Sequence, residues 1–266
     1  MVTPRPAWLS EPASSMTRQR AARTLLLVLA LLAGGVPAFA QRPRGGEGFL
    51  FRPPTGMFAV RAGFDLASAG SDVFTFVTDE LTVDRRDFSG PSIAFDAAFS
   101  LAPRVEAVFS VGTSRSTVSS EFRDWLDNND QPIEQVTRFQ RVPITGSIKA
   151  YLGAPGRSIG RFAWVPKRYA PYIGGGGGVM WYQLRQQGDF IDMATLRVFP
   201  DDFVSDGWTP TAQGFAGTDI SLTPRIALTV EGRYQWARAP LSIDYKGFDR
   251  IDLAGFAVTT GIAFRY

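Results

Sequence analysis

The sequence contains no cysteine and no histidine among its 266 residues. The first absence excludes disulfide bonds and thiol chemistry. The second removes the side chain that most often transfers protons near neutral pH. Lysine, which can replace histidine as the base for a serine nucleophile, is scarce: after residue 40 only Lys149, Lys167 and Lys246 occur. We therefore predict a protein that is not an enzyme, with no catalytic residue, no metal site and no cofactor.

Long apolar runs are missing as well. The longest, from Thr24 to Ala33, is half of the roughly 20 residues that a membrane-spanning helix needs. It follows three arginines and precedes Ala38-Phe39-Ala40, an order typical of a secretory signal peptide. We predict a signal peptide over residues 1–40, cleaved after Ala40, in preference to a transmembrane helix. Met16 offers a second start that would give a leader of conventional length.

The excess of positive charge belongs largely to this leader. The whole chain has 28 basic and 25 acidic residues, and a leader with four arginines and Glu11 leaves 24 of each. A neutral mature chain gives no reason to expect a nucleic-acid partner. Residues 41–56, rich in glycine, proline and arginine, are predicted to be a flexible periplasmic lead-in.

The last residues of the chain alternate in polarity. Small or charged side chains lie between bulky ones, and period two places the two sets on opposite faces of a strand. A bulky apolar face opposite a small, polar one fits lipid outside and a polar lumen inside. The bulky set is Phe256, Val258, Thr260, Ile262, Phe264 and Tyr266.

Seven earlier segments alternate in the same way. The predicted fold is all-β: an antiparallel up-and-down transmembrane β-barrel over residues 57–266, with eight strands and both termini in the periplasm. Ten strands are the alternative, since Val73–Val83 also contains extended-looking residues, which would otherwise lengthen the first hairpin. The eight predicted strands cover about 57–66, 91–101, 105–114, 139–152, 170–183, 211–222, 226–236 and 256–266.

The connections differ between the two ends of this barrel. Leu101-Ala-Pro-Arg-Val105 and Leu222-Thr-Pro-Arg-Ile226 are nearly the same tight turn, and residues 153–169 form a longer linker on that side. The short side carries six basic residues and no acid. Four polar stretches on the other side, 67–90, 115–138, 184–210 and 237–252, hold 18 acids against 10 basic residues. Acidic loops would suit the divalent cations that bridge lipopolysaccharide, although ordinary solvated loops explain them equally well.

Two sets of residues are candidate sites. Some charged residues take the alternate strand positions that point into the lumen. They must pair or be hydrated, since the interior of an eight-stranded barrel is just filled by side chains. They form either a structural plug of ion pairs or a gate that rearranges. This set is Arg61, Asp65, Asp96, Glu106, Lys149, Asp219, Glu231, Arg233 and Arg265. The aromatic residues predicted for the membrane interfaces are Trp164, Tyr172, Trp181, Trp208, Trp236 and Tyr266.

The alternating faces, tight turns and final aromatic residue together resemble the small OmpA-type and OmpW-type outer-membrane barrels. The resemblance implies export to the outer membrane, contact with its lipids and lipopolysaccharide, and recognition of the C-terminal strand by the assembly machinery. We expect a monomer with a structural or surface-interaction role. The alternative is a narrow channel for small solutes. An outer-membrane enzyme is the third candidate, although the enzymes of this class that the resemblance suggests depend on histidine.

Overall fold

The computed structural model describes residues 3–4, 48–127, 130–160, 163–192, 195 and 197–266. The predicted signal peptide and the first part of the lead-in therefore lie outside the described residues. Within the described ranges, no helix is both long and apolar enough to span a membrane. Besides the barrel strands given below, the structure contains the short strands β1 (Thr3–Pro4), β6 (Gly156–Ile159), β7 (Ala163–Pro166) and β11 (Ile251–Asp252).

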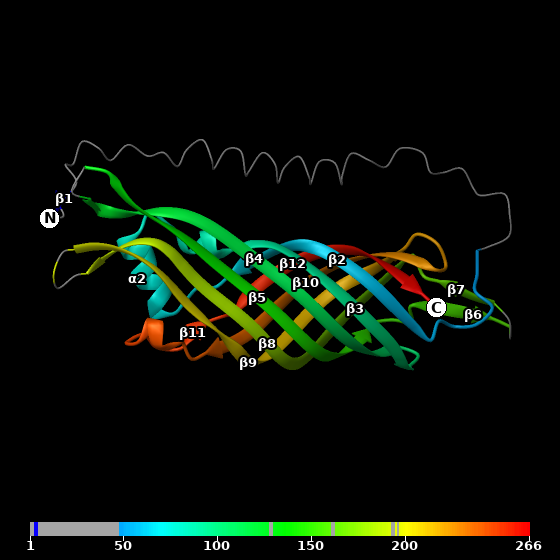
Figure 1. The fold of residues 1–266 in the computed structure, drawn as a ribbon. Helices are drawn as coiled ribbons and strands as arrows, with labels where there is room; N and C mark the ends of the chain where they lie inside the picture. The colour runs from blue at the N-terminus through cyan, green and yellow to red at the C-terminus, as the bar shows by residue number, and fades with distance from the viewer. Residues whose placement is uncertain (1–2, 5–47, 128–129, 161–162, 193–194, 196) are drawn as a thin grey trace, which may run out of the picture. The chain divides into compact units, whose positions relative to one another are not determined.

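Eight long strands form a closed antiparallel ring, as predicted (Figure 1). Each pairs with its neighbours in the chain, and the last strand pairs with the first from Gly255–Ala67 to Arg265–Met57. Where the ring is closed, each strand is hydrogen-bonded on both sides and no edge is left. The extensions of β4 beyond Ser114 and of β9 before Thr211 are not paired with β3 and β10. The strands are β2 (Gly56–Ala67), β3 (Gly90–Ala102), β4 (Val105–Leu126), β5 (Pro132–Tyr151), β8 (Tyr169–Asp192), β9 (Arg197–Ser221), β10 (Ile226–Ala239) and β12 (Gly255–Arg265).

Large apolar side chains remain exposed around the outside of the ring. The predicted alternation explains them, because they take every second position along their strands. An exposed apolar surface of this extent marks an interaction with lipid or protein. The belt includes Phe58, Val60, Phe64, Phe95, Phe109, Ile148, Ile173, Val179, Val230, Val258, Ile262 and Phe264.

Four strands are much longer than the sequence predicted. β4 and β5 continue through the predicted loop 115–138, and β8 and β9 through most of 184–210. β8 and β9 have 24 and 25 residues, whereas a tilted strand crosses a bilayer in about 9–11 residues. These stretches are therefore walls of the barrel that extend beyond the apolar belt, and their prediction as loops was wrong.

The prediction of extended structure at Val73–Val83 was also wrong, and with it the ten-stranded alternative. Residues Asp72–Glu80 form the helix α2, which buries Val73, Phe74 and Val77 on one face. The 3₁₀ helices η2 (Arg85–Phe88) and η3 (Ile243–Tyr245) lie in the first and last loops of the same end. Figure 1 shows α2 inside this end of the barrel.

The linker 153–169 forms a hairpin of β6 and β7 at the opposite end (Figure 1). Leu50 and Trp164 exchange two backbone hydrogen bonds, from Leu50 N to Trp164 O (2.8 Å) and from Trp164 N to Leu50 O (2.7 Å). Thr55 N also donates to Tyr266 O (2.8 Å). The described part of the predicted flexible lead-in is therefore tied to the hairpin and to the end of β12.

Candidate functional site

The lumen is the candidate site, and it contains all nine charged residues predicted for it. Seven of them are buried, and Asp96 and Glu106 expose about a tenth of their side chains (10% and 12%). Arg141, which the sequence analysis did not include, lies among them. Five cations thus face five carboxylates, so that the lumen is neutral as a whole. Isolated charges would be costly to bury here, and pairing offsets that cost.

We call the end of the barrel that holds α2 the upper end and the end with the β6–β7 hairpin the lower end. Arg61 is the centre of the upper of two charged clusters in the lumen. Its guanidinium binds Asp96 in a two-pronged arrangement, through Nε (2.5 Å) and Nη2 (3.0 Å). Arg61 Nη1 donates to Glu231 Oε1 (2.8 Å) and to Thr259 Oγ1 (2.9 Å). Ser110 Oγ donates to the second oxygen of Asp96 (2.6 Å). Paired donors of this geometry make strong, directional bonds, so Arg61 links the side chains of four consecutive strands of the ring, β3, β2, β12 and β10.

Glu231 connects Arg61 with Arg233 and with the aromatic residues below. Arg233 Nε donates to Glu231 Oε1 (2.9 Å), and Tyr172 Oη donates to Glu231 Oε2 (3.0 Å). The Arg233 guanidinium also lies 4.9 Å from the centre of the Phe215 ring. Phe215, the inward aromatic of the sixth predicted strand, occupies space that Gly174 leaves, because a Cβ at Gly174 would lie 2.3 Å from its ring.

Lys149 is the centre of the lower cluster. Its Nζ lies 2.9 Å from Asp219 Oδ2 and 3.4 Å from Glu106 Oε2. Tyr151 Oη also donates to Asp219 Oδ2 (2.7 Å), and Thr229 Oγ1 donates to Asp219 Oδ1 (2.8 Å). The ammonium group is 4.1 Å from the centre of the Tyr172 ring, a cation–π contact. Polar partners and aromatic rings thus surround the Lys149 ammonium group.

Arg141 pairs with Asp65 above these clusters. Its Nη2 lies 3.0 Å from Asp65 Oδ1, and its Nη1 donates to the carbonyl oxygens of Leu253 (3.0 Å) and Ala254 (3.3 Å). Arg141 has the same parity as Lys149 in β5, eight residues away. That parity was the available signal, since the predicted strand 139–152 already included Arg141.

Arg265 closes the lower end of the lumen. Its Nη1 donates to Ser221 Oγ (2.9 Å), and its guanidinium lies 5.9 Å from the centre of the Trp164 ring. Trp164 belongs to β7 and is 5% exposed. The β6–β7 hairpin thus places an aromatic side chain against the last charge of the lumen.

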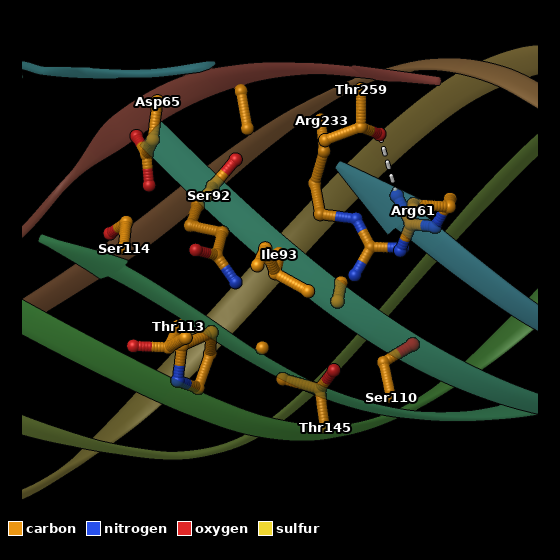
Figure 2. A pocket seen from close by; sticks show the side chains of 15 residues that line it. Arg61, Asp65, Ser92, Ile93, Ser110, Thr113, Ser114, Thr145, Arg233 and Thr259 are labelled. Atoms are coloured by element: carbon orange, nitrogen blue, oxygen red, sulfur yellow. Dashed lines mark hydrogen bonds between the residues drawn. The ribbon is translucent and has the colours of Figure 1, made fainter. Parts of the chain in front are cut away.

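Between Arg61 and Asp65 the lumen contains a small cavity, shown in Figure 2. Its wall includes Arg233, Ser110 and Thr145, from three different strands. The cavity offers about 40 Å³ to the centres of water-sized molecules. A single water needs roughly 10–15 Å³ by this measure, so there is room for a few waters but not for an organic solute.

Apolar residues from the strand extensions, the loops and α2 close the upper end of the barrel. We call this cluster the apolar cap. Phe74 of α2 packs against Phe88 and Phe139, with ring centres 4.7 and 5.4 Å away. Burial raises the pKa of the Tyr245 hydroxyl, which lies in the same cluster. The buried members of the cap are Ala69, Val73, Phe74, Val77, Leu81, Val83, Phe88, Phe122, Ile133, Phe139, Met180, Tyr182, Leu184, Ile191, Ala237, Ala239, Tyr245, Ile251 and Leu253.

The predicted interface aromatics divide into two groups. Trp208, Trp236 and Tyr266 are half exposed or more, and Trp181 is the direct cross-strand partner of Trp208 on the outer face. Trp164 and Tyr172 are 5% and 2% exposed, so their prediction as interface residues was wrong. Tyr172 points into the lumen because its position in β8 has inward parity, and Trp164 is covered by the hairpin and the lead-in.

No family model matches the sequence, and no curated protein matches it. Among solved structures, Neisserial surface protein A is 12% identical, with 84% of this chain and 100% of that chain covered and a TM-score of 0.42. Outer membrane protein W of E. coli is 13% identical, covering 81% and 100%, with a TM-score of 0.40. Ail of Yersinia pestis is 9% identical, covering 79% and 99%, with a TM-score of 0.41. The likeness concerns the fold alone, and the closed antiparallel ring of eight strands is seen in the structure itself.

Proposed function

We propose that the protein is a sealed outer-membrane barrel with a structural or surface-interaction role, and neither a channel nor an enzyme. The observation that carries this proposal is the filling of the lumen. Ion pairs occupy its lower part, the apolar cap fills its upper end, and Trp164 lies against Arg265 at its lower mouth. A solute would have to displace all three to pass.

The outer surface supports placement in a membrane. The apolar belt would be costly in water and suits lipid, and at the level of the belt the closed ring leaves no unpaired strand edge. The tight turns β3–β4 and β9–β10 lie at the end that faces the periplasm in barrels of this class. The extended hairpins β4–β5 and β8–β9 would then project from the cell surface.

These projecting walls are the proposed interaction surface. They carry exposed carboxylates, of which Glu134, Asp189 and Asp206 take outward positions. Divalent cations held between such carboxylates and lipopolysaccharide phosphates would anchor the protein among its neighbouring lipids. We expect lipopolysaccharide to remain bound through purification with Mg²⁺ and to be lost with a chelator; retention in chelator would contradict this bridging.

Planar-bilayer recording tests the sealed lumen. We expect no discrete current steps from the wild-type protein, and none from Glu231→Ala. Removal of that carboxylate takes one partner from Arg61 and one from Arg233 but leaves the apolar cap and Trp164 in place. A folded sample is identified by faster gel migration before boiling than after. Current steps from such a sample would overturn the sealed barrel, and steps that Glu231→Ala alters would favour a gated channel.

A further inference from the structure

The repeated turn remains without a role in the function proposed above. In each copy, Leu101 and Leu222 are about 60% exposed (62% and 58%) at the end of their strands, and Arg104 and Arg225 are exposed three residues later. The third connection at this end has the same composition, with Leu152 62% exposed after β5 and Lys167 and Arg168 exposed before β8. Each of these three connections between strands thus presents an exposed leucine close to a cation.

Backbone hydrogen bonds fix the positions of these cations. The carbonyl oxygen of Arg104 accepts from Tyr151 N (2.8 Å), that of Arg168 from Ser221 N (2.9 Å), and that of Arg225 from Arg265 N (2.8 Å). Each of the three arginines is therefore tied to the end of the neighbouring strand. They are held at the lower end of the barrel, its rim, in three separate connections between strands.

The charge of this rim is one-sided. The described residues 48–55, 103–104, 153–168 and 222–225 contain no acidic side chain. Their exposed cations make no salt bridge within the described part of the chain. The Arg168 guanidinium lies 5.7 Å from the centre of the Tyr169 ring, and Tyr169 is itself 57% exposed. We call Arg104, Lys167, Arg168 and Arg225 the basic rim.

The geometry points to a binding surface for the phosphate groups of anionic phospholipids in the periplasmic leaflet. Leu101 takes the last outward position of β3, and Leu152 and Leu222 directly follow the ends of β5 and β9, where acyl chains end. The cations follow within a few residues, at the level of the headgroups. Arginine suits a phosphate because its planar fork can donate two parallel hydrogen bonds, and cations beside a membrane favour anionic lipids. This inference rests on the proposed membrane placement, and the repeated turn and the absence of acids identify the ligand.

The test compares two variants that each lose four exposed positive charges. The rim variant carries Arg104→Ser, Lys167→Ser, Arg168→Ser and Arg225→Ser. The control variant carries Arg197→Ser, Arg238→Ser, Lys246→Ser and Arg250→Ser at the opposite end of the barrel. The full chain is expressed in bacteria, extracted from membranes and placed in phosphatidylcholine vesicles. Energy transfer from tryptophan to dansyl-labelled phosphatidylglycerol is compared with transfer to dansyl-labelled phosphatidylcholine with the same acyl chains.

We expect the wild-type and control proteins to prefer phosphatidylglycerol by roughly tenfold or more at low salt, and the rim variant to lose this preference. An equal preference in the rim variant, or none in the wild type, would overturn the lipid site. Displacement by soluble glycerol phosphate would also overturn it, in favour of a site for free phosphate. Failure of the protein to float with any vesicle would instead overturn the membrane placement.

Discussion

The barrel contains two different fillings along one continuous wall. Beside the apolar belt the interior consists of paired charges such as Arg61 and Glu231, and beyond the belt it consists of apolar residues such as Phe74 and Phe139. The difference follows from what lies outside. Where lipid covers the wall, apolar side chains are needed outside; where water covers it, they gain more by facing inward.

Strand β8 shows the exchange most clearly. In its first half the outward Ile173 and Val179 are about half exposed (52% and 44%), and in its second half the inward Tyr182 and Leu184 are 1% exposed. The β8–β9 ladder is continuous across this point, so no register shift causes the change. The side chains keep their alternation while the apolar ones change faces. This exchange marks the level at which the wall leaves the hydrocarbon, close to the Trp181–Trp208 pair.

Disruption of the charged filling should have the largest effect. Arg61→Leu would leave Asp96 and Glu231 without their principal cation, and loss of one partner of a buried ion pair costs about 3–5 kcal/mol. We expect the free energy of unfolding, measured by urea titration in vesicles, to fall by about that amount. Arg185→Leu removes an exposed ion pair from the projecting wall and should change it little. Equal effects of the two substitutions would mean that the lumen pairs are as dispensable as surface pairs.

Disruption of the apolar filling should act locally. Phe74→Ala removes a fully buried ring from the cap, and such truncations cost about 3–5 kcal/mol when the surroundings do not relax. Relaxation of the short helix α2 into the space left by the ring would reduce this cost, so we expect the lower part of the range. Proteases should then cut residues 67–90 while the barrel stays folded on the gel. The matched control is Phe76→Ala on the same helix, where the ring is 45% exposed. Loss of the whole barrel would show that the two fillings are one cooperative unit.

The sequence predicted the part of the molecule in which apolar side chains point outward and polar side chains point inward along every strand. In the lipid-covered half, parity alone placed Arg61, Lys149 and Glu231 in the lumen, because period two leaves no other choice. The projecting walls were missed because their apolar side chains change faces, so that 184–210 showed no outward apolar stripe. Helix α2 was missed because its burial depends on residues of the distant walls, and nine residues carry little helical signal of their own.

Two errors concern aromatic residues. Tyr172 alternates with the outward Ile173 and Val179, so parity already placed it inside, and the expectation of an interfacial belt was wrongly preferred. Trp164 lies in the linker, where no strand pattern applied. Its burial depends on a hairpin and on Leu50, which is more than 100 residues away in the sequence.

Charge substitution on the outer face can locate the level at which the apolar side chains change from the outer to the inner face of the wall. Val230→Arg places a cation on the lipid-covered wall, where the cost is about 2–4 kcal/mol near the middle of the bilayer. Gln187→Arg places the same cation on the outer face of the projecting part of β8 and should change stability by less than about 0.5 kcal/mol. Both are measured by urea titration in vesicles. A similar cost at the two positions would mean that lipid covers the whole length of the wall.

The smallest effect concerns the ion pair of the projecting wall. Arg185 Nε donates to Asp202 Oδ1 (2.7 Å), and this hydrogen bond holds the pKa of Asp202 below its ordinary value. Because the folded-state pKa is lowered, the pair stabilises the hairpin above the unfolded pKa of about 3.9, and this is lost as the pH falls through the folded value. A carbon-13 NMR titration of the Asp202 carboxyl should show that Arg185→Gln raises its pKa towards the ordinary value. An unchanged titration would mean that the pair does not persist in solution, and that the outer face of the projecting wall is held by its backbone and the apolar cap alone.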